Sequence, residues 1–420
     1  MLERYFFRPS TVDRIRANVA GAYIEHYVDW MRSQGYADRN VLRRVPLLCK
    51  FGDFASQRGA CDGESALGHV EEFAEHWQAI HRKACQSAEA LHKIGNEART
   101  PVRQMLDLAL RGSVLPHRQR KGFPFEADAP GFVAYLRDER GLKEVTVAQY
   151  AHYLSDFSKF LKRNKSESLT TFSPALLAAF IVERCPGLSH ASRRDLCGSL
   201  RVFLRYCHRE GLIDDDLSAA VEMPRTYRLA DVPRSITWDE VRRLLACVDR
   251  RAVVGRRDYA MLLLLVTYGL RANEVAHLTL DDIDWKRERL SIPLRKAGHW
   301  SAYPLASVVG EAIIDYLKNG RPETTDRHVF FRVVAPHSQI GSAAVSSAVA
   351  KYLHRAGVQV HRPGSHTLRH TCVQRLVDAE FDLKTVGDYV GHRSPQSTEI
   401  YTKVALTALR EVAMGNGEAL

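Results

Sequence analysis

The feature that most constrains this chain of 420 residues is a pair of basic, proline-containing breaks in an otherwise helical pattern. The first break is HRQRKGFPF at 117–125, and the second is MPRTYRLADVPRS at 223–235. Proline and glycine interrupt helices, and a chain of this length exceeds what one ordinary hydrophobic core accommodates. We therefore expect three parts, at 1–116, 122–225 and 233–420.

The first two parts read as helical throughout, and one stretch of each can be laid over the other. Each stretch reads as a helix, a glycine-containing turn and a second amphipathic helix. At a constant offset of 106, the matching residues are Gly35, Val41, Leu48, Phe51 and Phe54 with Gly141, Val147, Leu154, Phe157 and Phe160. Two interpretations stay open: a duplicated module, which would make 1–116 a second DNA-binding domain, or a pattern that any two helical hairpins share.

The third part mixes helical periodicity with one β-hairpin. RLSIPL, at 289–294, alternates apolar residues with a period of two, KAGH forms the turn, and WSAYPL, at 300–305, returns. Helical patterns cover 238–249, 257–268, 271–278, 307–318, 342–356, 366–379, 382–390 and 395–412. We therefore expect a mainly α fold with a small β-hairpin or sheet in the C-terminal domain.

Charge and cysteine usage narrow the class of protein. The formal net charge is +11 and the pI is near 9.3, which favours a polyanionic partner such as DNA. None of the eight cysteines forms a CxxC pair, which is typical of free thiols in a reducing compartment. The longest apolar run, MLLLLV at 261–266, is too short to span a membrane. We expect a cytoplasmic, nucleoid-associated protein without a membrane segment.

Six polar residues of the third part are candidates for catalysis. In chain order they are Arg271, Lys296, His366, Arg369, His392 and Tyr401. Taken singly, each has a structural explanation. A lysine at a hairpin tip is usually solvated, and an arginine at a helix start usually pairs with a nearby carboxylate, here that of Glu274.

Together, the six residues suit phosphoryl transfer. Two guanidiniums, those of Arg271 and Arg369, could hold the non-bridging oxygens of one phosphodiester and offset the charge of its transition state. A tyrosine hydroxyl, with a pKa of about 10 in water, needs a base or a positive field before it attacks. Lys296 could donate the proton that a leaving 5′-oxygen requires. No acidic cluster suited to magnesium accompanies these residues, so we expect no cofactor and no metal.

At this point the sequence resembles the tyrosine recombinase (phage integrase) family over about 122–420. The motifs that carry the resemblance are GLRANEV with Arg271, RKAGHWSAYPL with Lys296, HTLRHT with His366 and Arg369, and VGHRSPQSTEIYTKV with His392 and Tyr401. His392 follows His366 by 26 positions and Tyr401 follows nine later, which matches the family pattern.

The resemblance implies a helical core-binding domain at 122–225 and a catalytic domain at 233–420, which together form a C-shaped clamp on double-stranded DNA. It implies a 3′-phosphotyrosyl intermediate with a free 5′-hydroxyl, so that recombination needs neither ATP nor metal. His366 would assist proton transfer and hold the phosphate, and His392 would hydrogen-bond it. It further implies a monomer in solution that assembles as a homotetramer on DNA, with the tail at 404–414 docked on a neighbouring subunit. A tail that folds back on its own catalytic domain is the alternative.

Some positions depart from the family pattern. His299 stands where the family often has a second lysine, and Ser301 where it often has arginine. The segment DAEFD, at 378–382, lacks the glycine that the family usually has, which predicts a local change in turn geometry. The additional part at 1–116 and the tail ALTALREVA resemble recombinases of transposons and related mobile elements, which predicts integration, excision or transposition, with other recombinases of the same element as candidate partners.

The basic helix predicted over 192–209 is the candidate major-groove contact of the core-binding domain. Its candidate DNA-binding residues are Arg193, Arg194, Arg201 and Arg205. A solvated helix face is the alternative, and base-specific contacts cannot be inferred from this pattern.

Two other functions remain open. A type IB topoisomerase uses a similar set of residues, although the core-binding domain and the integrase spacings argue against it. A DNA-binding accessory subunit, whose partner does the cutting, is the other alternative, and the intact set of six residues argues against that one.

Overall fold

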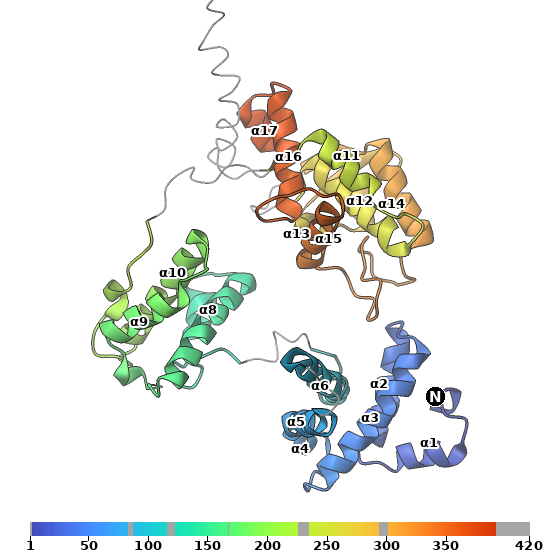
Figure 1. The fold of residues 1–420 in the computed structure, drawn as a ribbon, viewed down its shortest axis with the longest axis vertical. Helices are drawn as coiled ribbons and strands as arrows, with labels where there is room; N and C mark the ends of the chain where they lie inside the picture. The colour runs from blue at the N-terminus through green and yellow to red at the C-terminus, as the bar shows by residue number, and fades with distance from the viewer. Residues whose placement is uncertain are drawn as a thin grey trace, which may run out of the picture. The chain divides into compact units, whose positions relative to one another are not determined.

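The computed structural model describes residues 2–82, 87–115, 122–166, 168–225, 235–293 and 301–391. These residues are mostly helical (Figure 1), with one small sheet within 283–304 of the C-terminal part, so the predicted fold class is confirmed. The chain folds into two compact units, Met1–Val114 with Leu229–Leu420, and Leu115–Arg228. The large hydrophobic cores lie within 2–108, 125–221 and 236–368. Parts of both predicted breaks, 117–121 and 226–234, lie outside the described residues.

The N-terminal part is a helical bundle around aromatic residues. Its elements are η1 (Leu2–Arg4), α1 (Pro9–Arg16), α2 (Gly21–Ser33), α3 (Asp38–Ser56), α4 (Gly63–Leu67), α5 (Val70–His81) and α6 (Ala88–Arg111). The long helix α6 packs against α2, α3, α4 and α5. Phe51 of α3 meets Phe73 of α5 edge to face, with ring centroids 5.4 Å apart. These buried rings join α3 to α5, because aromatic pairs favour such geometry.

The second unit is also helical. Its elements are α7 (Phe132–Ala134), a π-helical turn η4 (Tyr135–Glu139), α8 (Glu144–Arg163), η5 (Leu169–Thr171), α9 (Pro174–Arg184), α10 (His190–Arg209) and η6 (Leu217–Ala220). The side chains of Ser173 and Ser189 cap α9 and α10 by accepting from backbone N–H groups of the first turn. Phe157 lies at the centre of the core, in contact with the rings of Phe172 and Phe180.

The two helical hairpins that the sequence matched are alike in the structure. Gly35 and Gly141 both adopt the left-handed conformation, with φ of 74° and 60°, and α3 and α8 begin at the same offset (38 and 144). The matched apolar side chains of both helices are buried. The likeness continues past the matched residues, since Asp62 caps α4 and Ser168 caps η5, again 106 positions apart. The helices before the turn differ, because α2 is regular whereas α7 continues into a π-helical turn.

The C-terminal part combines helices with the sheet. Its elements are α11 (Trp238–Ala246), α12 (Val253–Tyr268), α13 (Ala272–Ala276), η7 (Leu280–Asp282), β1 (Ile283–Asp284), β2 (Arg289–Ile292), β3 (Ser301–Pro304), α14 (Ser307–Asn319), α15 (Ser342–Arg355), α16 (Ser365–Asp378) and α17 (Leu383–Val390). The predicted helices up to 390 are confirmed, and the one predicted at 395–412 lies outside the described residues. Helix α12 is buried nearly all round and packs against α14 and α16.

The predicted hairpin is an antiparallel pair. Leu290 lies opposite Tyr303 and Ile292 opposite Ser301 in the register of β2 and β3. The turn between them, 294–300, lies outside the described residues and contains Lys296 and His299. A third strand, β1, pairs with the other edge of β2. It was not predicted, because two residues are too few to show a period of two.

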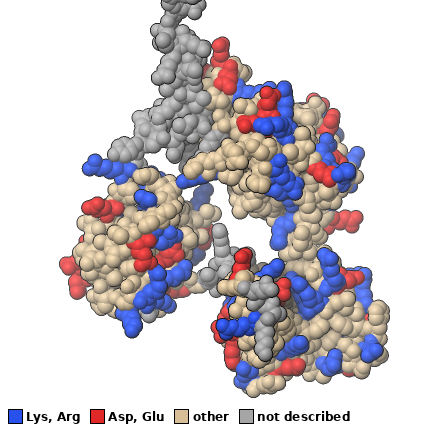
Figure 2. Space-filling model, in the orientation of Figure 1, with Lys and Arg blue, Asp and Glu red and all other residues tan. Residues whose placement is uncertain are grey.

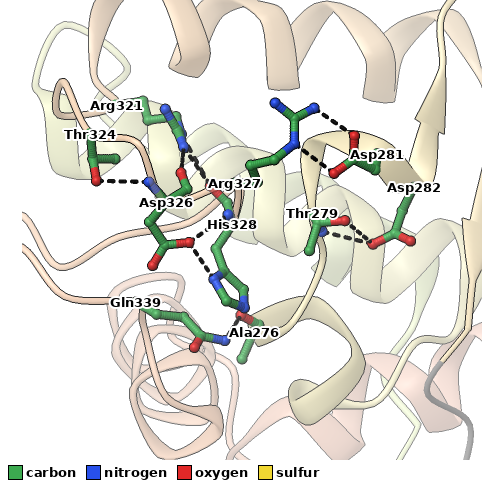
Figure 3. Close-up of polar contacts among 10 residues, drawn as sticks. All are labelled: Ala276, Thr279, Asp281, Asp282, Arg321, Thr324, Asp326, Arg327, His328 and Gln339. Carbon is green, nitrogen blue, oxygen red and sulfur yellow. Dashed lines mark hydrogen bonds and ion pairs between the residues drawn. The ribbon is translucent and has the colours of Figure 1, made fainter.

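Polar contacts fix the segment after α13 to the loop between α14 and α15 (Figure 3). The side chain of Arg327 forms an ion pair with Asp281 at 2.5 Å, and Arg321 donates to the carbonyl oxygen of His328 at 2.9 Å. Gln339 donates to the carbonyl oxygen of Ala276, the last residue of α13, at 2.8 Å. The C-terminal end of α13 is therefore held from several sides, which steadies the residue at its other end, Arg271.

The segment without the expected glycine does show an unusual turn. Helix α16 ends at Asp378, and Glu380 then adopts the left-handed conformation, with φ of 61°. A side chain in this region costs about 1 kcal/mol or more, which is why glycine is common there. The predicted local change in geometry is thus a strained glutamate.

The cysteines that the structure describes agree with the free thiols expected from the sequence. The seven cysteines that the structure describes are all free thiols. Among the helices of the described ranges, none is long and apolar enough to cross a membrane.

Candidate active site

Three of the six predicted catalytic residues belong to the described part of the chain: Arg271, His366 and Arg369. The other three, Lys296, His392 and Tyr401, lie outside it. The site is therefore built from the two arginines, the histidine and the elements that hold them.

Arg271 is positioned by the turn from α12 into α13. Helix α12 ends at Tyr268, and its C-cap is Gly269, whose φ is +60°. Leu270 is fully buried, and Arg271 is the N-cap of α13. Glu274 accepts hydrogen bonds from the backbone N–H of Arg271 at 2.9 Å and from its Nη1 at 2.8 Å. Only 2% of the Glu274 side chain is exposed, against 25% for Arg271. The buried carboxylate fixes one edge of a guanidinium whose other edge reaches solvent.

Arg369 is a buried residue of α16, 4% exposed. Its Nη1 donates to the carbonyl oxygen of Gly269, and its Nη2 donates to that of Val390 at 2.7 Å. Both carbonyls stand at helix C-termini, those of α12 and α17, where carbonyls have no partner within the helix and the helix dipole is negative. Arg369 therefore donates hydrogen bonds to carbonyl oxygens at two helix ends, and the negative ends of these two helix dipoles partly balance its positive charge.

The two arginines meet at the end of α17. Arg271 donates through Nη2 to the carbonyl oxygen of Gly391 at 2.8 Å, and the preceding carbonyl, that of Val390, accepts from Arg369. Adjacent residues of a chain are only about 3.8 Å apart, so these two bonds bring the guanidiniums together. The next residue along the chain is His392. The structure thus joins three of the sequence motifs, GLRANEV, HTLRHT and VGHR, at one point.

His366 lies in the first turn of α16 and is exposed. Its ring centroid is 6.2 Å from that of His370, one turn further along the helix. The start of α16 is fixed to α15, since the hydroxyls of Ser365 and Ser346 hydrogen-bond at 2.7 Å. His366 therefore projects from an anchored helix end, three residues before Arg369.

Three tyrosines that the sequence did not single out tie the hairpin to this site. Tyr303 of β3 donates to the carbonyl oxygen of Tyr389 in α17, and Tyr389 donates to that of Thr267 at 3.2 Å. Tyr268 donates to the carbonyl oxygen of Pro304 at 3.0 Å, and burial raises the pKa of its hydroxyl, which keeps it a donor. The base of the hairpin that carries Lys296 is thereby fixed beside α12 and α17.

Close packing surrounds the glycine at the end of α12. A Cβ atom on Gly269 would lie 2.9 Å from Cγ1 of Val390 and 3.2 Å from Sγ of Cys372. Cys372 is buried, which raises the pKa of its thiol to about 12, so the thiol stays neutral beside Arg369. Gly269 is thus needed both for its conformation and for the approach of α16 and α17.

The geometry can hold an anion at Arg271. An arginine has five N–H groups, and the contacts seen within the described ranges engage two of those on the Arg271 side chain, through Nη1 and Nη2. Three remain for an anion in the plane of the guanidinium, the geometry that suits a phosphate. In the same ranges, no group of three or more His, Cys, Asp or Glu side chains is arranged to hold a metal ion.

The candidate DNA-binding arginines lie on α10, as predicted. At 100° per residue, Arg194, Arg201 and Arg205 fall within an arc of about 40°. Arg205 donates to the hydroxyl of Ser218 at 3.2 Å, and Arg201 lies 3.5 Å from the carbonyl oxygen of Val221. Arg194 is exposed, and Arg193 donates to the carbonyl oxygen of Leu188 at 3.1 Å. Three of these four arginines therefore also anchor their own unit.

Comparisons with known proteins agree on one family. The phage integrase family model matches residues 234–407, and the phage integrase N-terminal SAM-like domain model matches residues 130–211. A putative integrase/recombinase of Sinorhizobium fredii, y4rA, is 31% identical over 396 residues, 93% of each chain. Tyrosine recombinase XerC of Oceanobacillus iheyensis is 28% identical over 289 residues, 67% of this chain and 93% of XerC. A lambda integrase tetramer bound to a Holliday junction has a TM-score of 0.51 at 18% identity, over 72% of this chain and 86% of the integrase.

Proposed function

This chain belongs to the phage integrase family and is a tyrosine recombinase of site-specific DNA recombination, and we propose that Tyr401 is its nucleophile. The observation that carries the proposal is the meeting of Arg271 and Arg369 at the end of α17. That helix end leads directly into the segment with His392 and Tyr401. The nucleophile is thus attached to the element on which both guanidiniums converge.

The proposed reaction exchanges one phosphodiester for another. The Tyr401 oxygen attacks the scissile phosphorus, a P–O bond to Tyr401 forms, and the bond to the 5′-oxygen breaks. The tyrosine proton passes to His366, and the leaving 5′-oxygen takes a proton from Lys296. The DNA 3′-phosphate stays on Tyr401 until a 5′-hydroxyl of the exchanged strand attacks it. Because the number of phosphodiester bonds is unchanged, the exchange requires no ATP.

The two arginines would stabilise the transition state of each step. Arg271 offers its three remaining N–H groups to the non-bridging oxygens, and Arg369 supplies a second charge that is already desolvated and fixed. A fixed donor in a partly buried site stabilises developing charge without reorganising first. His392 would complete the oxygen contacts. In this scheme protein cations neutralise the phosphate, so a divalent ion is not required for cleavage.

Double-stranded DNA is the partner of this family, and assembly follows from the reaction. Exchange between two duplexes cuts four strands, which four subunits with one nucleophile each can perform, as the lambda integrase tetramer on a Holliday junction suggests. We propose a monomer in solution that forms this tetramer on DNA, with each subunit holding DNA between 122–225 and 233–420 and with 404–414 docked on a neighbour. The tail at 404–414 lies outside the described residues.

The biological setting that we propose is a mobile element. The relative from Sinorhizobium fredii shares the additional N-terminal part, because the match covers 93% of both chains. Integration, excision or transposition of such an element would take place on chromosomal DNA in the cytoplasm, where other recombinases of the same element could take part.

A covalent trap tests the proposal. DNA fragments that flank the gene are screened for binding, and the bound site is rebuilt as a suicide substrate nicked next to the cleavage position. Wild-type protein should then give a protein–DNA band that resists denaturation, and Tyr401→Phe should bind the DNA without giving the band. Tyr259→Phe is the matched control, since it removes a hydroxyl from α12 about 15 Å along the helix from Gly269 and should leave the band. A band from Tyr401→Phe would show that another residue is the nucleophile.

A further inference from the structure

The N-terminal part has a basic hollow of its own. Its volume is about 220 Å³, and α3, α5 and α6 contribute to its walls. The lining residues are Arg43, Arg44, Pro46, Leu47 and Lys50 of α3, Trp77 of α5 and Glu97 of α6. We call this the α3 hollow. Figure 2 shows basic and acidic side chains mixed over the visible surface. The net charge therefore does not locate an anion-binding surface, whereas a local cluster of cations can.

Arg44 is the residue that points to a ligand. Its side chain is half-buried, and its Nη1 bonds to the neutral oxygens of Tyr27 and Gln104. Burial raises the pKa of the Tyr27 hydroxyl, so this oxygen carries no negative charge that could balance the arginine. Within the described ranges no carboxylate forms an ion pair with Arg44, and its buried Nε has no hydrogen-bond partner. The ring of Tyr36 lies 4.7 Å from the guanidinium and offsets part of its charge, but no anion does, so a half-buried guanidinium of this kind favours an anionic ligand.

The other walls add positive charge and a flat ring. Arg43 and Lys50 are both exposed, and they lie seven residues apart on α3, which is two helical turns or about 10 Å. The one carboxylate in the lining, that of Glu97, is 4.0 Å from Arg43. The ammonium of Lys50 lies 5.1 Å from the centre of the Trp77 ring. The lining therefore holds three cations and one carboxylate. The distance of about 10 Å between Arg43 and Lys50 along α3 is comparable to the spacing of several phosphates along a DNA strand.

We propose that the α3 hollow binds the phosphate backbone of DNA, with one phosphate at Arg44 and its neighbours at Arg43 and Lys50. The inference rests on DNA being the partner of this recombinase. It is supported by the likeness between the two helical hairpins, because α3 corresponds to α8, which lies in the unit matched by the integrase SAM-like model. Residues 1–116 would then act as an additional DNA clamp that lengthens the contacted duplex.

Salt dependence measures these contacts. Binding of the full chain to a fluorescent 60-base-pair duplex is followed by anisotropy across a salt series, for wild type and for Arg43→Gln/Lys50→Gln. Each phosphate contact contributes about 0.9 to the slope of log K against log[salt], so losing two should reduce the slope by roughly 1.8. If the affinities coincide at 1 M salt, the dissociation constant at 0.1 M should rise about 60-fold.

A matched control separates local contacts from net charge. Arg8→Gln/Arg111→Gln removes two exposed cations of the same part, and Arg111 lies 14 residues beyond Glu97 on α6, about 21 Å along the helix. This control should retain the wild-type slope within experimental error. Equal losses in both double variants would mean that only net charge matters and would overturn the proposal, as would an unchanged slope in Arg43→Gln/Lys50→Gln.

Arg44→Met distinguishes binding from a structural role. The variant keeps the apolar stem, and Tyr27 and Gln104 still bond to each other at 2.8 Å. Its thermal midpoint should equal or exceed that of the wild type, because an unpaired, half-buried charge is removed, while the salt slope falls by about 0.9. A lower midpoint with an unchanged slope would assign Arg44 a purely structural role and contradict the proposal. If the wild-type chain binds DNA but forms no covalent complex through Tyr401, only the proposed chemistry is wrong. If the wild-type chain binds no DNA, both the proposed chemistry and the proposed role of the α3 hollow are wrong.

Discussion

Replacing Gly269 by alanine should impair catalysis from a buried position. Gly269 has a φ of +60°, where an alanine costs about 1 kcal/mol of folding free energy. The new Cβ would also lie 2.9 Å from Cγ1 of Val390, and ordinary contact begins near 3.4 Å, so Val390 must retreat by 0.5 Å or more (3.4 − 2.9). Such overpacking adds about 1–3 kcal/mol, so the variant should lose about 2–4 kcal/mol of stability.

The displacement would reach the active site directly. The carbonyls of Val390 and Gly391 hold Arg369 and Arg271, and the carbonyl of Gly269 also accepts from Arg369. A misplacement on the order of 1 Å costs roughly 100-fold in rate, so a shift of half that size or more should reduce covalent trapping by Gly269→Ala roughly 10-fold to 100-fold. DNA affinity should stay near the wild-type value, because most of the surface that meets DNA is unchanged.

Gly357→Ala is the control for this substitution. Gly357 has a φ of +68° at the end of α15, but a Cβ there would meet no atom within 4 Å. It should lose only the conformational cost of about 1 kcal/mol and trap DNA at the wild-type rate. Thermal unfolding gives the stabilities, and single-turnover formation of the covalent complex gives the rates. Equal trapping by Gly269→Ala and wild type would refute the idea that α17 positions the arginines.

Three further predictions follow from the site and its surroundings. Lys296→Ala should slow cleavage of an ordinary phosphodiester far more than cleavage of a 5′-bridging phosphorothiolate, since sulfur leaves without a proton; equal slowing would make Lys296 a positioning residue. Cleavage should persist in excess EDTA, because in the proposed mechanism Arg271 and Arg369 neutralise the phosphate, and strict magnesium dependence of this step would contradict that role. Glu380→Gly should stabilise the protein by about 1 kcal/mol, because it relieves a left-handed glutamate with φ of 61°, and thermal unfolding would show no gain if the turn is unstrained.

The sequence predicted the elements of this fold better than their junctions. Helices such as α12 and the β2–β3 hairpin show periods of 3.6 and two over enough residues to be recognised. Strand β1 is too short for any period. The left-handed Glu380 could be anticipated only as a missing glycine, because the conformation itself depends on how α16 ends.

The sequence likewise predicted the residues of the site better than the contacts that hold them. The motifs predicted that Arg271 and Arg369 act together, but not that helix-end carbonyls hold them, since Gly269 and Arg369 are 100 residues apart. The tyrosine contacts of Tyr268, Tyr303 and Tyr389 were missed for the same reason, and their only local signal is an aromatic residue at or next to the C-terminal end of each element. Arg44 could not be distinguished from its exposed neighbours, because one-dimensional patterns do not show which cation lacks a counter-ion.

The identity of the residue that carries DNA tests the central claim most directly. The covalent complex is digested with nuclease and trypsin, and the modified peptide is sequenced by mass spectrometry. Cleavage after Arg393 and Lys403 releases SPQSTEIYTK, residues 394–403, which contains one tyrosine. We predict a nucleotide joined through its 3′-phosphate to Tyr401 in this peptide. Attachment to any other residue, or through a 5′-phosphate, would contradict the account.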